Sequence, residues 1–292
     1  MKKAIALVTF FSICLLLIFS KQISKITTDV IINFYMKVLP LLAPTMLLNY
    51  IFIYSGGMSS LIYDLKLKPI TKHKINKYAL IILGIISGTP SLASMLNEEI
   101  DKSLTKDEVQ NILNCFTMPS LPFLIALING CDWNTTAKII VIIIPFTIQF
   151  IVYFITSYKS KCNYSEINIS CKKNIISNAI LSTAKTIVLM SGSIIFFSLM
   201  SYPFNLFFKG NVLMLVKGLF EFSYPLNYFF STYSSENIFY IIIIVSFSSV
   251  SLLAQVKLIV PNISLKEILK KRLIITAFSL ILITLFFYLN IQ

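Results

Sequence analysis

The sequence predicts an all-α membrane protein that crosses the bilayer several times, with about seven to nine apolar helical segments. Of its 292 residues, 57% are hydrophobic and only 13% are charged, whereas a soluble domain has about 25% charged residues. Lysine-rich segments lie between the apolar stretches. We therefore interpret the net charge of +13 as a topology signal rather than a nucleic-acid-binding surface, and expect no nucleic-acid partner.

Nine stretches approach the length of about 20 apolar residues that a helix needs to span the hydrocarbon core. They cover residues 4–20, 30–54, 78–97, 109–131, 139–158, 175–202, 212–231, 237–256 and 273–291. The first stretch lacks a small-x-small cleavage signal, so we interpret it as a retained helix. The chain then divides into a signal-anchor helix and loop (1–29), a first membrane half (30–158), a basic cytoplasmic loop (159–174) and a second membrane half (175–292).

Lysine-rich segments orient the chain, because short basic loops stay in the cytoplasm. The four basic segments are Lys2 with Lys3, 61–77, 158–174 and 261–272, and they place the N-terminus in the cytoplasm. Three apolar stretches separate the second segment from the third, and three more separate the third from the fourth. An odd number of crossings cannot return a chain to the same side, so one stretch in each trio should not cross.

Three apolar stretches carry a helix break. The breaks lie at 87–91 and 118–122, where proline removes a backbone donor, and at the serine-rich 246–251. Irregular backbone at membrane depth survives only when it is buried in protein or lines a cavity. Each half of the chain contains such breaks, which is the layout of inverted repeats in secondary transporters.

The acidic turn between the third and fourth stretches predicts the start of a helix. Thr105 and Glu108 have the spacing of a capping box, and apolar residues follow at helical spacing. We expect a helix from about Lys106 toward Pro119, and we interpret the acids as a surface turn rather than a binding site.

Four charged residues lie inside apolar stretches: Lys37, Lys185, Lys217 and Glu221. Ionisable groups at membrane depth are costly, which favours a functional interpretation. The alternative for the lysines is snorkelling toward the interface. Lys217 and Glu221 are four residues apart and could pair on one helical face, either as a neutralising pair or as a substrate or ion site.

The predicted substrate-binding residues combine the groups at the breaks with three of these charges. Clustered serines beside glycine and proline are expected to line a site, and half-helix N-termini offer N–H groups to an anion. The set is Ser87, Gly88, Thr89, Pro90, Ser91, Pro119, Ser120, Pro122, Lys185, Lys217, Glu221, Ser248, Ser249 and Gln255.

The sequence does not favour an enzyme. The apolar stretches contain no aspartate and no histidine, which removes the usual membrane protease and metal-hydrolase sets. Five cysteines have no C-x-x-C spacing, and the single histidine, His73, falls in a lysine-rich segment that we interpret as a loop. We therefore expect no catalytic residues, no metal and no cofactor.

The broken stretches resemble a known family. The motifs are Gly88-Thr89-Pro90-Ser91-Leu92-Ala93, Asn114-Cys115-Phe116-Thr117-Met118-Pro119-Ser120-Leu121-Pro122-Phe123, Lys217-Gly218-Leu219-Phe220-Glu221-Phe222, Ser246–Val256 and Arg272-Leu273. Their order and spacing resemble the gate, or nucleoside-recognition, regions of the YlbJ-type sporulation integral membrane proteins. Two positions depart from that pattern: Ser248-Ser249 replaces paired glycines, and Phe220-Glu221 replaces Leu-Glu.

The resemblance implies a fold similar to concentrative nucleoside transporters and a role in spore formation. The expected function is a secondary transporter for a small polar or anionic solute, with dipicolinic acid as the implied solute. The alternatives are a structural membrane protein of spore assembly and a nucleoside permease. The implied location is the bacterial cell membrane, specifically the outer forespore membrane; the partners are the solute and the lipid bilayer, and a homo-oligomer is left open.

Overall fold

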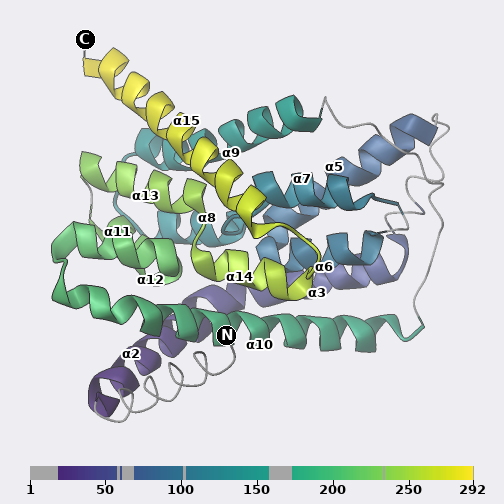
Figure 1. Ribbon diagram of the computed structural model, residues 1–292, viewed down its shortest axis with the longest axis horizontal. Helices are drawn as coiled ribbons and strands as arrows, with labels where there is room; N and C mark the ends of the chain where they lie inside the picture. The colour runs from purple at the N-terminus through teal and green to yellow at the C-terminus, as the bar shows by residue number, and fades with distance from the viewer. Residues whose placement is uncertain are drawn as a thin grey trace.

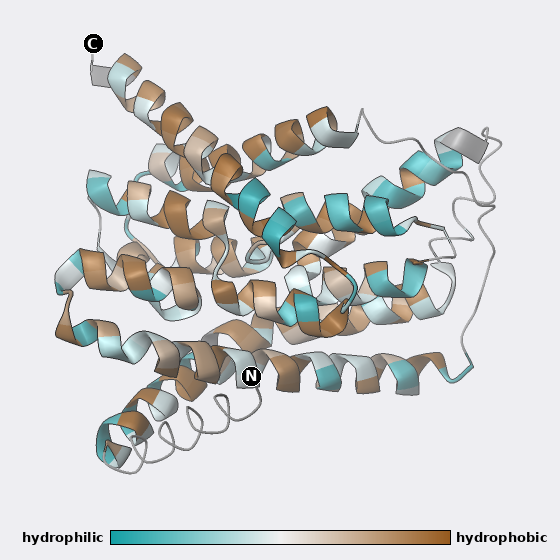
Figure 2. Cartoon of the chain, in the orientation of Figure 1, coloured by the Kyte–Doolittle hydropathy of each residue, from teal (hydrophilic) through white to brown (hydrophobic). Residues whose placement is uncertain are grey.

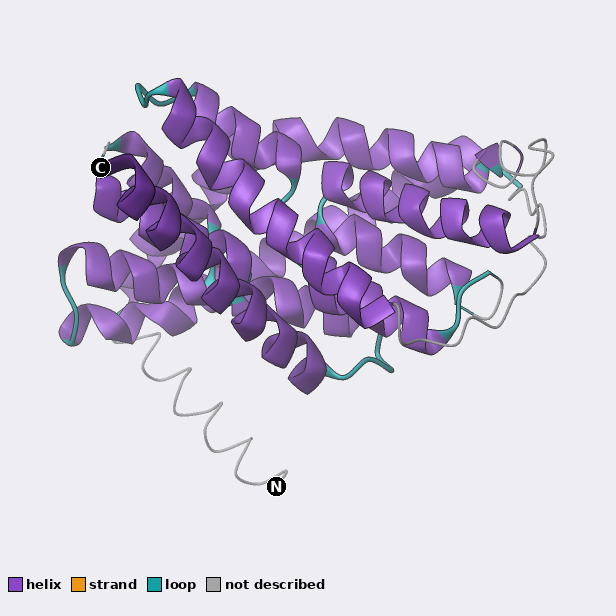
Figure 3. Ribbon diagram, turned by 90° about the horizontal axis from the view of Figure 1, so that it is seen from above, coloured by secondary structure: helices purple, strands orange, loops and turns teal. Residues whose placement is uncertain are grey.

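The computed structural model describes residues 19–57, 60, 69–100, 103–157, 173–232 and 234–291. This part of the chain is almost entirely helical and contains no strand, which confirms the all-α prediction (Figures 1 and 3). Most of the predicted first helix, the basic residues 61–68 and most of the basic loop 159–174 lie outside the described residues.

The first half of the described chain contains seven α-helices and one π-helical turn. Residues 21–29, predicted to form a loop, are helical. The elements are α2 (Ser20–Asn33), η1 (Phe34–Val38), α3 (Leu39–Tyr54), α5 (Pro69–Ser87), α6 (Thr89–Glu99), α7 (Lys106–Phe116), α8 (Leu121–Asn129) and α9 (Thr135–Ser157).

The second half repeats the order of the α-helices from α3 onward, in the opposite direction, whereas α2 has no counterpart. It comprises α10 (Ile175–Ser201), η2 (Tyr202–Leu206), α11 (Gly210–Phe220), α12 (Ser223–Ser231), α13 (Ser235–Phe247), α14 (Val250–Ile259) and α15 (Leu265–Ile291). In Figure 1, α3 and α9 run toward the right-hand end, whereas α10 and α15 run away from it. Equivalent helices of the two halves also make equivalent contacts. The contact of α6 with α14 corresponds to that of α12 with α8, and the contact of α7 with α15 corresponds to that of α13 with α9. This is the arrangement of an inverted repeat.

Five helical segments are long and apolar enough to cross a membrane: Lys106–Asn129, Thr135–Ser157, Ile175–Leu206, Ser235–Ile259 and Leu265–Leu289. A sixth candidate joins α2 to α3 through a 52° bend. The remaining helix pairs, α5 with α6 and α11 with α12, fold back as hairpins that enter from opposite ends (Figure 1). One stretch in each trio is therefore a hairpin, as the charge pattern requires.

The identity of these hairpins differs in part from the predicted breaks. The break at Gly88 does form a hairpin, but the breaks at 118–122 and 246–251 lie inside spans. The second hairpin is the stretch 212–231, which breaks at Glu221–Phe222, a position that showed no break in the sequence.

The broken spans occupy the middle of the molecule, and the unbroken spans lie outside them. The spans Lys106–Asn129 and Ser235–Ile259 are 67% buried, compared with 28% for Ile175–Leu206 and for Leu265–Leu289. Large apolar side chains such as Phe154, Val188 and Leu285 are exposed on the outer helices. Figure 2 shows many brown residues along α9 and α15 and a mixture of brown, white and teal along α10; the exposed apolar side chains of these helices form the surface that a bilayer would cover.

Candidate functional site

Three helix breaks meet in the interior of the protein. The Thr89 hydroxyl, after the α5–α6 break, donates to the Met118 carbonyl (2.6 Å) and accepts from the Met118 N–H (2.7 Å). Ser248, with φ of +60°, donates its hydroxyl to the Thr117 carbonyl. We call this junction, formed by residues 88–89, 117–120 and 248–249, the helix crossing.

The serines at the helix crossing bind backbone. Ser120 and Ser249 are N-caps, since their Oγ atoms accept the N–H of Phe123 (3.3 Å) and of Leu252 (3.4 Å). The Ser87 hydroxyl donates to the Leu83 carbonyl (2.8 Å). A solute that used these oxygens would compete with the bonds that form the breaks.

The prolines and the glycine at the breaks also have local structural roles. Pro90 and Pro122 stand at the first turns of α6 and α8, where a missing N–H costs nothing, and Pro119 precedes the Ser120 cap. Gly88 has φ of +88°, and an added Cβ would come 3.3 Å from the Ser120 Cβ. These residues define the geometry of the helix crossing.

The buried role of Arg272 is the main feature that the sequence does not predict. We had placed this residue in a cytoplasmic segment, but it lies inside α15 and is 0% exposed. Its guanidinium donates to the carbonyls of Cys115 (2.6 Å), Val245 (3.2 Å) and Phe247 (3.4 Å). These carbonyls belong to the last turns of α7 and α13. The sequence offered two signals: Arg272 is its only arginine, and Arg272-Leu273 is one of the motifs on which the family resemblance rests.

A line of polar side chains runs along one face of α10. Ser182 bonds Tyr54 (2.7 Å), Thr186 bonds Tyr50 (3.1 Å), and Ser193 accepts from the Gln255 amide (2.7 Å). We call this line, with Ser91, Glu98 and Ser251 that adjoin it, the polar seam.

Two groups of the polar seam are available to a ligand. Among the described residues, the Gln255 Oε1 and the Ser91 Oγ are buried and make no hydrogen bond of normal geometry, although Ser91 lies beside the Tyr50 hydroxyl. Buried polar atoms are normally satisfied, so each of these atoms is a candidate contact for a solute N–H or O–H group. Of the predicted site residues at the breaks, these two fit that role best.

Lys217 and Glu221 line one cavity of about 160 Å³ between α2, α10, α11 and α12. They do not form the predicted pair on a helical face, because α11 ends at Phe220 and Glu221 is extended. The Glu221 carboxylate instead accepts the N–H (3.0 Å) and hydroxyl (2.8 Å) of Ser223. Among the described residues it makes no ion pair. The other polar residues of the cavity are Asp29, Ser198, Ser201 and Tyr224.

The remaining predicted charges lie elsewhere. Lys185 is exposed on the outer face of α10, away from the helix crossing, as the snorkelling alternative requires. The side chain of Lys37 lies outside the described part of the structure.

A buried ionic cluster joins α5 to the start of α7. The Glu108 carboxylate binds His73 (2.9 Å) and Lys77 (3.4 Å), and it completes the predicted capping box with Thr105. The helix start at Lys106 is thereby confirmed. His73 is not in a loop as we had interpreted it, but in α5, where it is 1% exposed.

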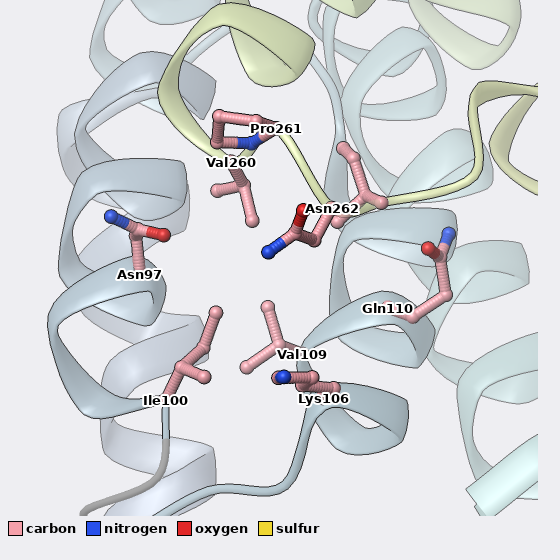
Figure 4. Close-up of a pocket in the computed structure, with 9 residues that line it drawn as sticks. Asn97, Ile100, Lys106, Val109, Gln110, Val260, Pro261 and Asn262 are labelled. Carbon is pink, nitrogen blue, oxygen red and sulfur yellow. The ribbon is translucent and has the colours of Figure 1, made fainter.

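A second cavity, of about 240 Å³, opens between α6, α7 and the loop that joins α14 to α15. Figure 4 shows Asn262 projecting from that loop toward Asn97 of α6. Gln110 holds the loop in place through the N–H (2.7 Å) and carbonyl (3.2 Å) of Ser264. The cavity offers amide groups and the Lys106 ammonium to a polar solute.

Together, the spans, the hairpins and the helix crossing define a polytopic α-helical membrane protein with broken helices in its interior. Comparison of the chain with models of protein families, with curated proteins and with solved structures finds no match.

Proposed function

We propose that this protein is a secondary transporter for a small polar or anionic solute. The observation that carries the proposal is the helix crossing, where broken helices of two oppositely oriented halves meet. Secondary transporters place their solute sites near such discontinuous helices at the interface of the repeats. A purely structural bundle has no need of irregular backbone at this depth, which must be stabilised by extra hydrogen bonds.

The proposed route for the solute follows the polar seam. Gln255 and Ser91 supply the unpartnered buried oxygens near the helix crossing. The N-termini of α8 and α14, which begin there, direct positive dipole ends toward the crossing and so favour an anion. Lys217 adds a cationic group in the Glu221 cavity.

Uptake into proteoliposomes tests the proposed transport directly. Purified protein should accumulate labelled solute above the level of protein-free vesicles, and Gln255→Ala should reduce this uptake without lowering the amount of reconstituted protein. The matched control is Lys270→Ala, a change on the exposed face of α15. Equal uptake with and without protein would favour the alternative of a non-transporting structural protein.

Dipicolinate is the solute that the family resemblance implies. This small planar dianion would suit the N-terminal ends of α8 and α14 or the separate Lys217 cavity, whereas a nucleoside would suit the amide of Gln255 or the separate cavity lined by Asn97 and Asn262. In a spore-forming source organism, deletion of the gene should lower the dipicolinate content and heat resistance of spores. Normal values of both would contradict the sporulation role, and accumulation of labelled nucleoside by a host expressing the protein would support a nucleoside permease.

A further inference from the structure

Two half-helices end at the same point in the protein interior. The guanidinium of Arg272 binds Cys115 in the last turn of α7, and Val245 and Phe247 in the last turn of α13. The C-terminus of a helix carries about −0.5 charge, because its last carbonyls lack intrahelical partners. Two such ends sum to about −1, which is the charge that one guanidinium balances.

No carboxylate shares in this balance. Among the described residues, Arg272 forms no ion pair with an aspartate or glutamate. A fully buried cation without compensation would be very unfavourable, so the helix ends are its counter-charge.

The choice of arginine is also informative. The other 24 basic residues are lysines, and the only arginine occupies this position. A planar guanidinium has five donors in a fixed fork and can bond carbonyls of two helices at once, whereas a lysine ammonium acts as a point charge.

In transporters built from inverted repeats, the C-terminal ends of half-helices coordinate the coupling ion, Na⁺ or H⁺. We propose that Arg272 is a built-in cation that permanently fills this position, so that the helix crossing requires no bound metal cation. The proposal predicts that solute uptake is independent of Na⁺, and this prediction rests on the proposed transport function. It also predicts that the stability of the protein is independent of Na⁺, and this prediction does not rest on the transport function.

The stability test uses purified full-length protein and needs no solute. Replacing Na⁺ by choline at constant ionic strength should leave the Tm of the wild-type protein unchanged. A Tm that falls when Na⁺ is removed, in the wild-type protein, would overturn the proposal.

Arg272→Ala should lower the Tm by at least about 5 °C, because it leaves the carbonyls of two helix ends buried and unpaired. Millimolar guanidinium should restore part of the loss, whereas urea, which is neutral and similar in shape, should not. Lys270→Ala, on the exposed face of the same helix, should show neither the loss nor the restoration. A variant that responds equally to urea and guanidinium would contradict a role for charge.

If Arg272→Ala does not fold, two further variants can test the proposal instead. Arg272→Lys keeps the charge, and Arg272→Met keeps most of the length without it. The proposal expects the order of Tm to be wild type, then Arg272→Lys, then Arg272→Met. An Arg272→Met protein as stable as Arg272→Lys would overturn it.

Uptake provides the separate test of coupling. Wild-type proteoliposomes that transport solute should do so equally in Na⁺ and in choline buffers, and Na⁺-dependent uptake would overturn the proposal. Absence of uptake in both buffers would instead contradict the proposed function, and the Tm measurements would still decide the role of Arg272.

Discussion

At the scale of single residues, two glycines allow the hairpins to pack closely. A Cβ added to Gly84 would come 2.7 Å from the Cβ of Leu92 on the facing helix α6, and one added to Gly218 would come 2.4 Å from Cδ1 of Ile244. Both distances are shorter than any normal contact between carbon atoms. Each hairpin therefore has one position where no side chain fits without movement of its neighbours.

Gly84→Ala should lower the stability of the protein by about 1–3 kcal/mol, because the new methyl group overpacks a buried contact. The control is Gly192→Ala in α10, where an added Cβ meets nothing within 4 Å. That change should be neutral, or stabilising by up to about 1 kcal/mol, since alanine favours helix. Thermal unfolding in detergent measures both, and equal effects would contradict the packing described here.

Thr89→Val should destabilise the helix crossing, because the hydroxyl both donates to and accepts from the Met118 backbone. Each buried backbone group left unpaired costs about 1–3 kcal/mol. Thr89→Ser retains the hydroxyl and should lose much less. The measurement is the apparent Tm of the two variants, and the idea fails if valine and serine are tolerated equally.

Glu221→Gln removes the negative charge at the α11–α12 break but keeps an oxygen that can accept hydrogen bonds, so it distinguishes an electrostatic role of Glu221 from a structural one. The amide oxygen can still accept from Ser223, so the amount of protein in the membrane should stay normal. If the carboxyl group takes part in transport, most solute uptake should be lost in this variant. Unchanged uptake with glutamine would assign Glu221 a purely structural role.

At the scale of elements, the sequence predicts a helix boundary correctly where residues at the boundary itself interrupt the helix. The Gly88-Thr89-Pro90 sequence and the Thr105 capping box both predicted helix boundaries that the structure confirms. The break at Glu221 has no glycine or proline of its own. Besides the local bonds from Ser223 to the Glu221 carboxylate, it makes contacts with residues from elsewhere in the fold, such as Phe222 against Phe123, with ring centroids 5.4 Å apart. Local patterns in a sequence cannot report such contacts.

Glu108 should be the most sensitive acid at the start of α7. Glu108→Ala removes the capping box and leaves His73 and Lys77 buried without their carboxylate, a loss of about 3–5 kcal/mol for a broken buried pair. Asp107→Ala, at the exposed neighbouring position, should cost less than about 1 kcal/mol. Thermal unfolding of the two variants checks the difference, and similar losses would rule out a special role for the buried cluster.

At the scale of the whole molecule, the charge pattern and the fold give one consistent topology. The chain enters and leaves the basic loop between α9 and α10 at the same end as the start of α5 (Figure 1). The α11–α12 hairpin enters from the opposite end. The start of α5, the end of α9 and the start of α10 therefore lie at one end of the molecule (Figure 1), and by the charge rule we propose that this end faces the cytoplasm.

Cysteine accessibility tests this topology. In a cysteine-free background, Lys209→Cys, exposed before α11, should react with a membrane-impermeant thiol reagent added to intact cells. Lys74→Cys, exposed on α5, should react only after the cells are permeabilised. Reaction of both positions from the same side would contradict the hairpin assignment.

The sequence alone could predict the fold class and most of the helix breaks, because these follow from hydropathy and proline. It could not predict the role of Arg272. That residue closes a run of basic residues and looks like part of a loop, and its partner Cys115 is 157 residues away in the chain. Nor could it show that Thr89 and Ser248 bind backbone rather than solute.

The reciprocal contacts between the halves have a mechanical consequence. Helix α6 packs on α14 of the second half, and α12 packs on α8 of the first. These two contacts lie on opposite sides of the helix crossing, since the hairpins enter from opposite ends (Figure 1). A tilt of one half about the crossing would therefore separate one contact while compressing the other, which is the motion that the proposed transport function needs to expose the interior to the two ends in turn.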